Sequence, residues 1–200
     1  MQSNKIFAAA ILALAGLAST SATAELVVNG DFEMGDTGWS AHDMNFSKSS
    51  PYAHSGSGLA STGCNDNDCV QNLGEGAYLG QTLSTDANSM YTLSFWVGET
   101  GDGPSGFSVF WDGKRVAEKL NPANNTLVPN ISSMVQYSFD SLMATGASTI
   151  FEIHGYQNFA KIYFDDVSVI KDINSVPEPS SLALIGLGLA GLAFVKRKKA

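Results

Sequence analysis

Polar and apolar residues alternate along much of the chain, as they do in strands that bury one face. Between positions 91 and 97, Tyr, Leu, Phe and Val take the odd places and Thr, Ser and Trp the even ones, so Trp96 lies opposite the apolar face. Similar runs rich in Val, Ile, Tyr, Phe and Thr predict further strands at 107–111, 114–120, 135–142, 149–154 and 161–170.

Helical periodicity is nearly absent between positions 25 and 175, where clusters of Gly, Asn, Asp and Ser separate the apolar runs. Asp112-Gly113 stands between two of these runs and is typical of a tight hairpin turn. The pattern predicts an all-β fold, a jelly-roll β-sandwich, in a single domain of residues 25–175.

Both ends of the chain are apolar in a different way. Lys5 precedes an uncharged run from Ile6 to Leu17, and Ala22-Thr23-Ala24 follows. This order predicts a signal peptide over residues 1–24, removed before Glu25. A core helix is the alternative, but it does not account for the small residues at the end of the run.

A second apolar run extends from Leu182 to Val195 and ends in the basic cluster 196–199. The run is short for a transmembrane helix, which needs about 20 residues. The basic cluster favours a cytoplasmic tail. With the body of the chain exported, we expect a short helix that halts in the inner membrane.

The segment before this helix contains Pro177, Glu178 and Pro179. Together with the Gly-rich apolar helix and the basic end, residues 176–200 resemble the PEP-CTERM sorting domain of Gram-negative bacteria. The resemblance implies recognition by an exosortase, processing near Pro-Glu-Pro, and a cell-surface or extracellular-matrix location in the setting of exopolysaccharide and biofilm. A permanent single-span anchor is the alternative.

The net charge of the domain and its two cysteines limit which ligands and bonds are expected. Six basic and eighteen acidic residues lie between positions 25 and 177, which gives a formal net charge of −12. Such a surface disfavours nucleic acid. Cys64 and Cys69 enclose Asn-Asp-Asn-Asp, and export favours a disulfide between them over a metal site.

The order of segments within the domain resembles the carbohydrate-binding module 4/9 type, in the galactose-binding-like jelly-roll group. The segments that carry this resemblance are Leu26–Glu33, Gly38-Trp39, Ala53–Gly58, Gln81–Leu83, Tyr91–Phe95 and Ile162–Val169.

The resemblance implies a structural Ca²⁺ that joins the first and last strands. The matching carboxylates are Glu33 and Asp165, with Asp31 and the carbonyls of residues 55–57 as further ligands. Asp165 shares parity with Val167 and Val169, so we expect it to face inward, where a carboxylate needs a partner. Oxygen ligands suit Ca²⁺. The alternative is that Asp165 only accepts hydrogen bonds from backbone donors and that Asp31 and Asp166 are exposed.

Aromatic side chains supply the candidates for glycan binding, since rings stack on the C–H faces of sugars. Trp96 and Phe110 would form a platform if their strands are neighbours on one face; Tyr78, Tyr156, Gln157 and Asn158 are weaker candidates. Packing in the core is the alternative, and it is favoured for Trp39 and Trp111.

No hydrolase elbow, zinc-protease motif or phosphate loop is present in the sequence. The sequence therefore predicts a non-enzymatic domain that associates with extracellular polysaccharide. A structural or adhesive protein without glycan specificity is one alternative. A small polysaccharide hydrolase, which needs only two carboxylates, is another.

Overall fold

The structure is a computed structural model that describes residues 24–63, 76–101, 104–121, 133–157 and 160–172. These residues form ten strands: β1 (Ser40–His42), β2 (Asn45–Ser47), β3 (Leu59–Thr62), β4 (Tyr78–Ser84), β5 (Met90–Thr100), β6 (Ser105–Trp111), β7 (Lys114–Asn121), β8 (Val135–Met143), β9 (Ser148–Gln157) and β10 (Lys161–Lys171).

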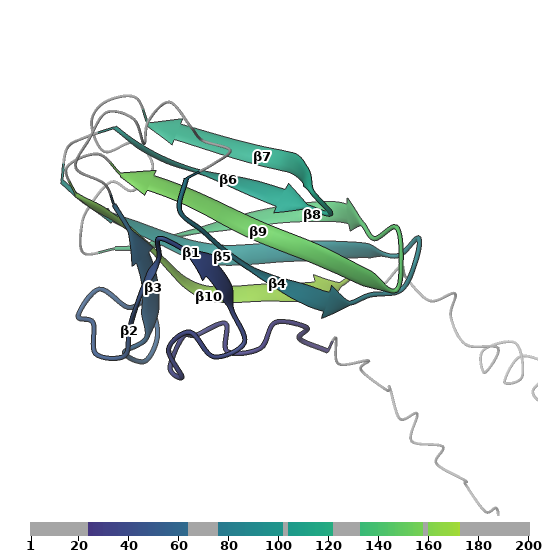
Figure 1. Ribbon diagram of the computed structural model, residues 1–200, viewed down its shortest axis with the longest axis horizontal. Helices are drawn as coiled ribbons and strands as arrows, with labels where there is room; N and C mark the ends of the chain where they lie inside the picture. The colour runs from purple at the N-terminus through teal and green to yellow at the C-terminus, as the bar shows by residue number, and fades with distance from the viewer. Residues whose placement is uncertain (1–23, 64–75, 102–103, 122–132, 158–159, 173–200) are drawn as a thin grey trace, which may run out of the picture.

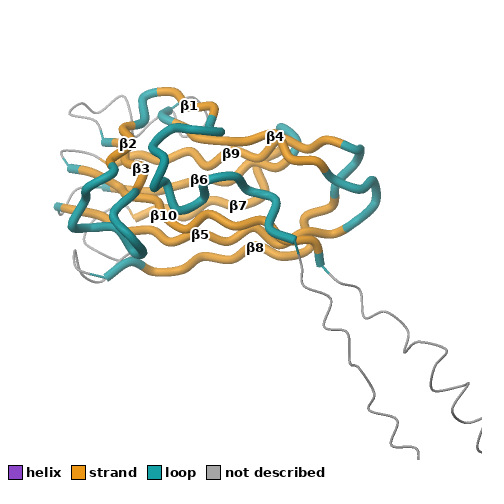
Figure 2. The backbone as a smooth tube through the Cα atoms, turned by 90° about the horizontal axis from the view of Figure 1, so that it is seen from below, coloured by secondary structure: helices purple, strands orange, loops and turns teal. Residues whose placement is uncertain are grey.

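The strands form two antiparallel sheets that pack face to face (Figures 1 and 2). The front sheet, which faces the viewer in Figure 1, has the order β1-β4-β9-β6-β7. The back sheet has the order β2-β3-β10-β5-β8. The described part of the chain is thus an all-β two-sheet sandwich, as the alternating pattern predicts.

The core lies between the sheets and is rich in aromatic rings. Phe95 of β5 meets Phe107 of the front sheet and Phe164 of β10 at ring-centroid distances of 5.3 and 6.0 Å, both edge to face. All three side chains are fully buried. Burying one such ring contributes roughly 1.5–3 kcal/mol. The Phe95–Phe107 contact joins the two sheets, and the Phe95–Phe164 contact lies within the back sheet.

The strands predicted from position 91 onward are confirmed. The hairpin between β6 and β7 is also confirmed: Asp112 and Gly113 have φ angles of 52° and 74°, and Trp111 pairs with Lys114. These angles are those of the two-residue turn that suits the twist of a hairpin.

The expected first strand is wrong. Residues 26–33 are irregular, with bends and turns from residue 28 onward, and the isolated bridge between Glu25 and Ile170 precedes them. Asn29 and Phe32 have positive φ angles of 56° and 54°, which lie far from those of an extended strand and turn the chain twice within four residues. The expected flanking helices lie outside the described residues.

Candidate functional site

Asp165 lies on the outer face of the back sheet, not on the inner face with Val167 and Val169. It pairs with Trp96, whereas Ser168 pairs with Ser94, so β10 has one more residue than β5 over this stretch. This β-bulge reverses the parity of the strand. The prediction of an inward Asp165 is wrong because alternation alone cannot reveal an inserted residue.

Residues 48–58 connect β2 and β3, and the part from 51 to 58, which we call the 51–58 loop, covers Asp165. Asp165 is completely buried. Its carboxylate accepts hydrogen bonds from the backbone N–H groups of His54 (2.7 Å), Ser55 (3.1 Å) and Asp166 (2.7 Å). Burial raises the pKa of the Asp165 carboxyl from 3.8 to about 6, against the opposing effect of these donors. The side chain thus fixes the path of the 51–58 loop.

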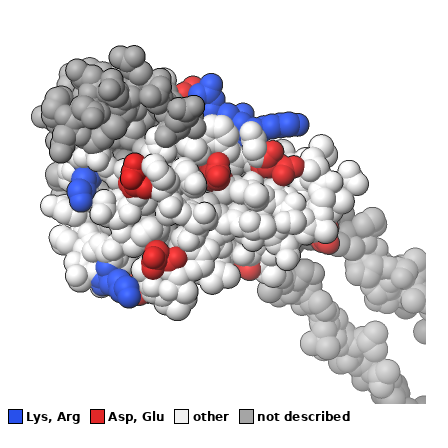
Figure 3. Space-filling view, in the orientation of Figure 1, with Lys and Arg blue, Asp and Glu red and all other residues white. Residues whose placement is uncertain are grey.

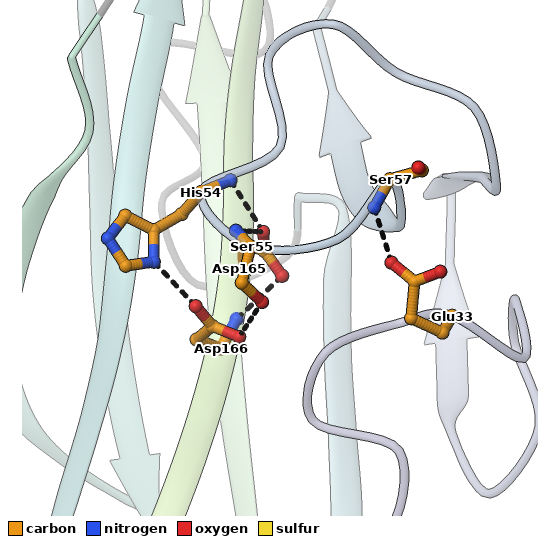
Figure 4. A network of polar contacts seen from close by, with 6 residues as sticks. All are labelled: Glu33, His54, Ser55, Ser57, Asp165 and Asp166. Carbon is orange, nitrogen blue, oxygen red and sulfur yellow. Dashed lines mark hydrogen bonds and ion pairs between the residues drawn. The ribbon is translucent and has the colours of Figure 1, made fainter.

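Asp166 holds the side chains of the same loop (Figure 4). One carboxylate oxygen lies 2.5 Å from Nδ1 of His54, and the other accepts a hydrogen bond of 2.6 Å from the Ser55 hydroxyl. The His54 ring stacks on Trp96 at a centroid distance of 3.6 Å and an interplanar angle of 13°. Adjacent carboxylates on β10 therefore hold the backbone and the imidazole of one loop residue.

Glu33 holds the far end of the 51–58 loop. Its Oε1 accepts hydrogen bonds from the backbone N–H groups of Ser57 (2.5 Å) and Gly58 (2.6 Å). These donors lower the pKa of the Glu33 carboxyl below its ordinary value of 4.5. In Figure 4, Glu33 and Asp165 lie on opposite sides of the loop, each pointing toward it.

The expected calcium ligands do not converge. Glu33 and Asp165 direct carboxylate oxygens at backbone N–H donors of the 51–58 loop. Asp31 is exposed and lines a separate pocket of about 310 Å³ together with Asp166. Among the described residues, no group of three or more His, Cys, Asp or Glu side chains is placed to hold a metal. Calcium binding stays a prediction from the resemblance.

Trp96 and Phe110 lie on different sheets, so they cannot form one platform. Trp96 is on the outer face of β5 under His54, whereas Phe110 is on the outer face of β6 in the front sheet. Tyr78 and Tyr156 share that front face with Phe110. The structure thus brings together three of the four aromatic candidates and separates the fourth.

Tyr78 and Phe110 belong to a row of rings that crosses four adjacent strands. The row runs from His42 on β1 through Tyr78 on β4 and His154 on β9 to Phe110 on β6. Successive ring centroids are 6.0, 5.2 and 4.5 Å apart. We call these four residues the aromatic row.

Polar groups accompany the aromatic row. Glu152 lies beside it, with one carboxylate oxygen 3.2 Å from Nε2 of His154. Nδ1 of His154 is buried and has no hydrogen-bond partner among the described residues. Tyr156, two residues further along the same face of β9, is 6 % exposed and packs over Gly106 of β6.

Sequence reasoning missed His42, Glu152 and His154. The alternation on β9 carried a signal for the last two, because Phe151 and Ile153 are inward and their neighbours must face outward. Figure 3 shows the front face as mostly uncharged, with a few separate acidic and basic side chains. The aromatic row itself contains no Lys, Arg, Asp or Glu side chain.

Several predicted features lie outside the described residues: the signal peptide, the Cys64–Cys69 disulfide, Asn158, the motif Pro177-Glu178-Pro179, and the apolar run 182–195. Within the described ranges, no helix is long and apolar enough to span a membrane. Gln157 is buried at the end of β9, facing inward, away from the aromatic row.

Comparison with known proteins identifies the C-terminal segment. Residues 175–198 match the PEP-CTERM protein-sorting motif. No curated protein sequence matches the chain.

Solved structures share the sandwich. TmCBM61, in complex with β-1,4-galactotriose, superposes with a TM-score of 0.55 at 13% identity, covering 74% of this chain and 99% of that one. For the CBM22-1 xylan-binding domain of Paenibacillus barcinonensis Xyn10C the values are 0.52, 16%, 76% and 97%. For the K3 cleaved adhesin domain of Porphyromonas gingivalis Lys-gingipain they are 0.51, 19%, 74% and 99%.

Likeness at such low identity establishes a shared fold and nothing finer. The sorting motif, in turn, implies export, sorting to the cell surface and processing by exosortase. The chain therefore carries a C-terminal PEP-CTERM sorting motif and a β-sandwich that resembles carbohydrate-binding modules of the CBM61 and CBM22 types.

Proposed function

We propose that the exported domain binds extracellular polysaccharide through the aromatic row of the front sheet and catalyses no reaction. The observation that carries this proposal is the row itself, four rings in lateral contact across four strands on an outer face. Strands are spaced by about 4.8 Å, so the row extends over about 14 Å. That length suits an oligosaccharide stretch of a longer chain.

The chemistry of the row fits a neutral glycan. Sugar rings present apolar C–H patches, which contact aromatic rings, and hydroxyl groups, which need hydrogen-bond partners. The Glu152 carboxylate and the Tyr78 hydroxyl offer such partners beside the rings. TmCBM61 and the xylan-binding domain, whose sandwiches this domain resembles, bind galactotriose and xylan.

Affinity electrophoresis of the purified protein tests the proposal. The probes are soluble β-1,4-galactan, xylan and bacterial exopolysaccharide. We expect F110A and Y78A each to weaken binding by roughly 2- to 10-fold, because an aromatic contact contributes about 0.5–1.5 kcal/mol beyond buried area. Ile150→Ala is the matched control: it shares strand β9 and the same face with His154 but is half-exposed and outside the row.

Two alternatives remain within the same experiment. Retardation by none of the probes, with all variants folded, would favour a structural or adhesive role without glycan specificity. Release of reducing sugar from a bound polysaccharide, lost in E152Q, would favour a hydrolase.

A further inference from the structure

A second pocket opens on the outer face of the back sheet, on the opposite side of the sandwich from the aromatic row. It has a volume of about 400 Å³ and lies between β5, β10 and the 51–58 loop. Gly98 leaves its floor without a side chain; a Cβ there would lie 3.1 Å from Cγ of Met134. The aromatic residues that line it are Tyr52, His54, Trp96 and Tyr163.

The rings of this pocket are held in two stacked pairs. His54 covers Trp96, and Tyr52 stacks on Tyr163 at a centroid distance of 5.2 Å and an angle of 26°. Because Asp165 and Asp166 hold the loop that carries His54, the wall of the pocket is set before any ligand arrives. A pre-formed wall reduces the entropy lost on binding.

Trp96 differs from the other two tryptophans in its indole N–H. Trp39 donates to the carbonyl of Asn29 and Trp111 to that of Met143, both at 2.9 Å. The Trp96 N–H has no hydrogen-bond partner among the described residues, although this side chain lines the pocket. The lining of the pocket therefore includes a residue with an indole N–H donor.

The remaining polar groups of the pocket suit a ligand rich in hydroxyl groups. His54 Nδ1 is bonded to Asp166, which leaves Nε2 as its second hydrogen-bonding position. No Lys, Arg, Asp or Glu is among the described lining residues. A lining of uncharged aromatic side chains that carry hydrogen-bonding groups favours a neutral, oxygen-rich ring as the ligand. The volume of the pocket is at the small end of ligand pockets, which span about 300–1,000 Å³.

We propose that this pocket binds a single sugar ring, at the end or a branch of a polysaccharide, and that the domain thereby bridges two glycan chains, one on each face. The proposal rests on the proposed function for the aromatic row. A single-ring site on one sheet and a chain site on the other make one small domain bivalent, and bivalent binders cross-link the polymers they hold. The exported protein would then tie together extracellular polysaccharide.

The first experiment tests the pocket alone. Methyl glycosides of glucose, galactose, mannose, xylose and N-acetylglucosamine are titrated to millimolar concentration while the indole N–H signals are followed by NMR. We expect at least one glycoside to shift the Trp96 signal. Trp96→Phe, which keeps a ring but removes the donor, should weaken that glycoside at least about fivefold, and Gly98→Ala, which fills the floor, should weaken it too. Phe110→Ala should leave it unchanged.

The second experiment tests bridging with polysaccharide-coated beads. The wild type is expected to cluster the beads, whereas W96F and F110A each bind without clustering or cluster far less. Clustering by W96F equal to that of the wild type would overturn the bridging proposal. Absence of any glycoside response at Trp96 would overturn the pocket, even if the aromatic row binds polysaccharide; loss of all polysaccharide binding would instead refute the proposed function.

Discussion

Neutralising Asp165 should change the pH dependence of folding stability, because this carboxyl is fully buried and yet ionises near pH 6. Burial raises its pKa in the folded protein from 3.8 to about 6. The folded state therefore binds the proton more tightly than the unfolded chain does. The stability contributed by this group is fully present below about pH 4 and is lost as the pH rises through about 6.

The magnitude follows from the size of the pKa change. One pKa unit corresponds to about 1.4 kcal/mol, so the rise to about 6 amounts to about 3 kcal/mol between the two ends of the window. The three backbone N–H donors oppose the change, since they favour the ionised form. The burial of Asp165 under the 51–58 loop exceeds their combined effect.

Urea unfolding of the wild type and D165N, in steps from about pH 4 to about pH 7.5, measures this difference. Asparagine cannot ionise, and its altered hydrogen bonding adds an offset that is the same at every pH. As the pH rises, we expect the free energy of unfolding of D165N to increase by about 3 kcal/mol relative to that of the wild type. D140N, which removes an exposed carboxyl on β8, is the control and should parallel the wild type.

Parallel curves for D165N and the wild type would refute the reasoning, because the carboxyl would then titrate alike in the folded and unfolded states. If the free energy of unfolding of the wild type instead rose relative to that of D165N with increasing pH, the pKa of Asp165 would be lowered by folding, not raised. That result would show that the N–H donors of His54, Ser55 and Asp166 dominate over burial.

Other predictions concern the loop, the metal and the tail. Gly58→Ala is expected to destabilise the domain by about 3 kcal/mol or more in urea unfolding, because its Cβ would lie 2.4 Å from the backbone carbon of Phe32; Gly146→Ala, whose nearest neighbour is 3.8 Å away, should be nearly neutral. If the domain binds calcium, we expect millimolar Ca²⁺ to raise the Tm above its value in EDTA and E33Q to abolish this increase. An unchanged Tm would mean that the Glu33 carboxylate only accepts hydrogen bonds from the loop backbone. Mass spectrometry of the mature C-terminus should find an end near Pro177–Pro179, and an intact basic tail on membrane-bound protein would mean a permanent anchor.

The later strands could be predicted from sequence because most have a run of five or more residues rich in Val, Ile, Tyr, Phe or Thr, and β5 also alternates strictly from Tyr91 to Val97. The first third could not. Strands β1, β2 and β3 have only three or four residues, too few to show a period, and β3 is buried along its whole length. The turns of residues 26–33 depend on positive φ angles at Asn29 and Phe32, neither of which is glycine.

The candidate site was predictable in its residue types but not in its geometry. Their aromatic side chains and positions in the sequence pointed to Phe110, Tyr78 and Trp96. The sheet that each strand joins, however, depends on pairing between distant segments. Trp96 pairs with Asp165 and Phe110 with Glu152, far apart along the chain. The bulge after Asp165 also depends on this pairing. The alternation of residues along one strand therefore predicts neither the separation of Trp96 from Phe110 on two sheets nor the outward direction of the Asp165 carboxylate.

The way in which the 51–58 loop is fastened has a consequence for how this domain can vary. Glu33 and Asp165 grip the loop by main-chain N–H groups, which every residue except proline possesses. Substitutions at 54, 55 and 57 therefore leave these anchoring bonds in place. The hydrogen bonds that fix the backbone of the loop are thus independent of its side chains. Point substitutions in the loop can therefore change the ligand preference of the pocket beside Trp96 without altering the rest of the fold.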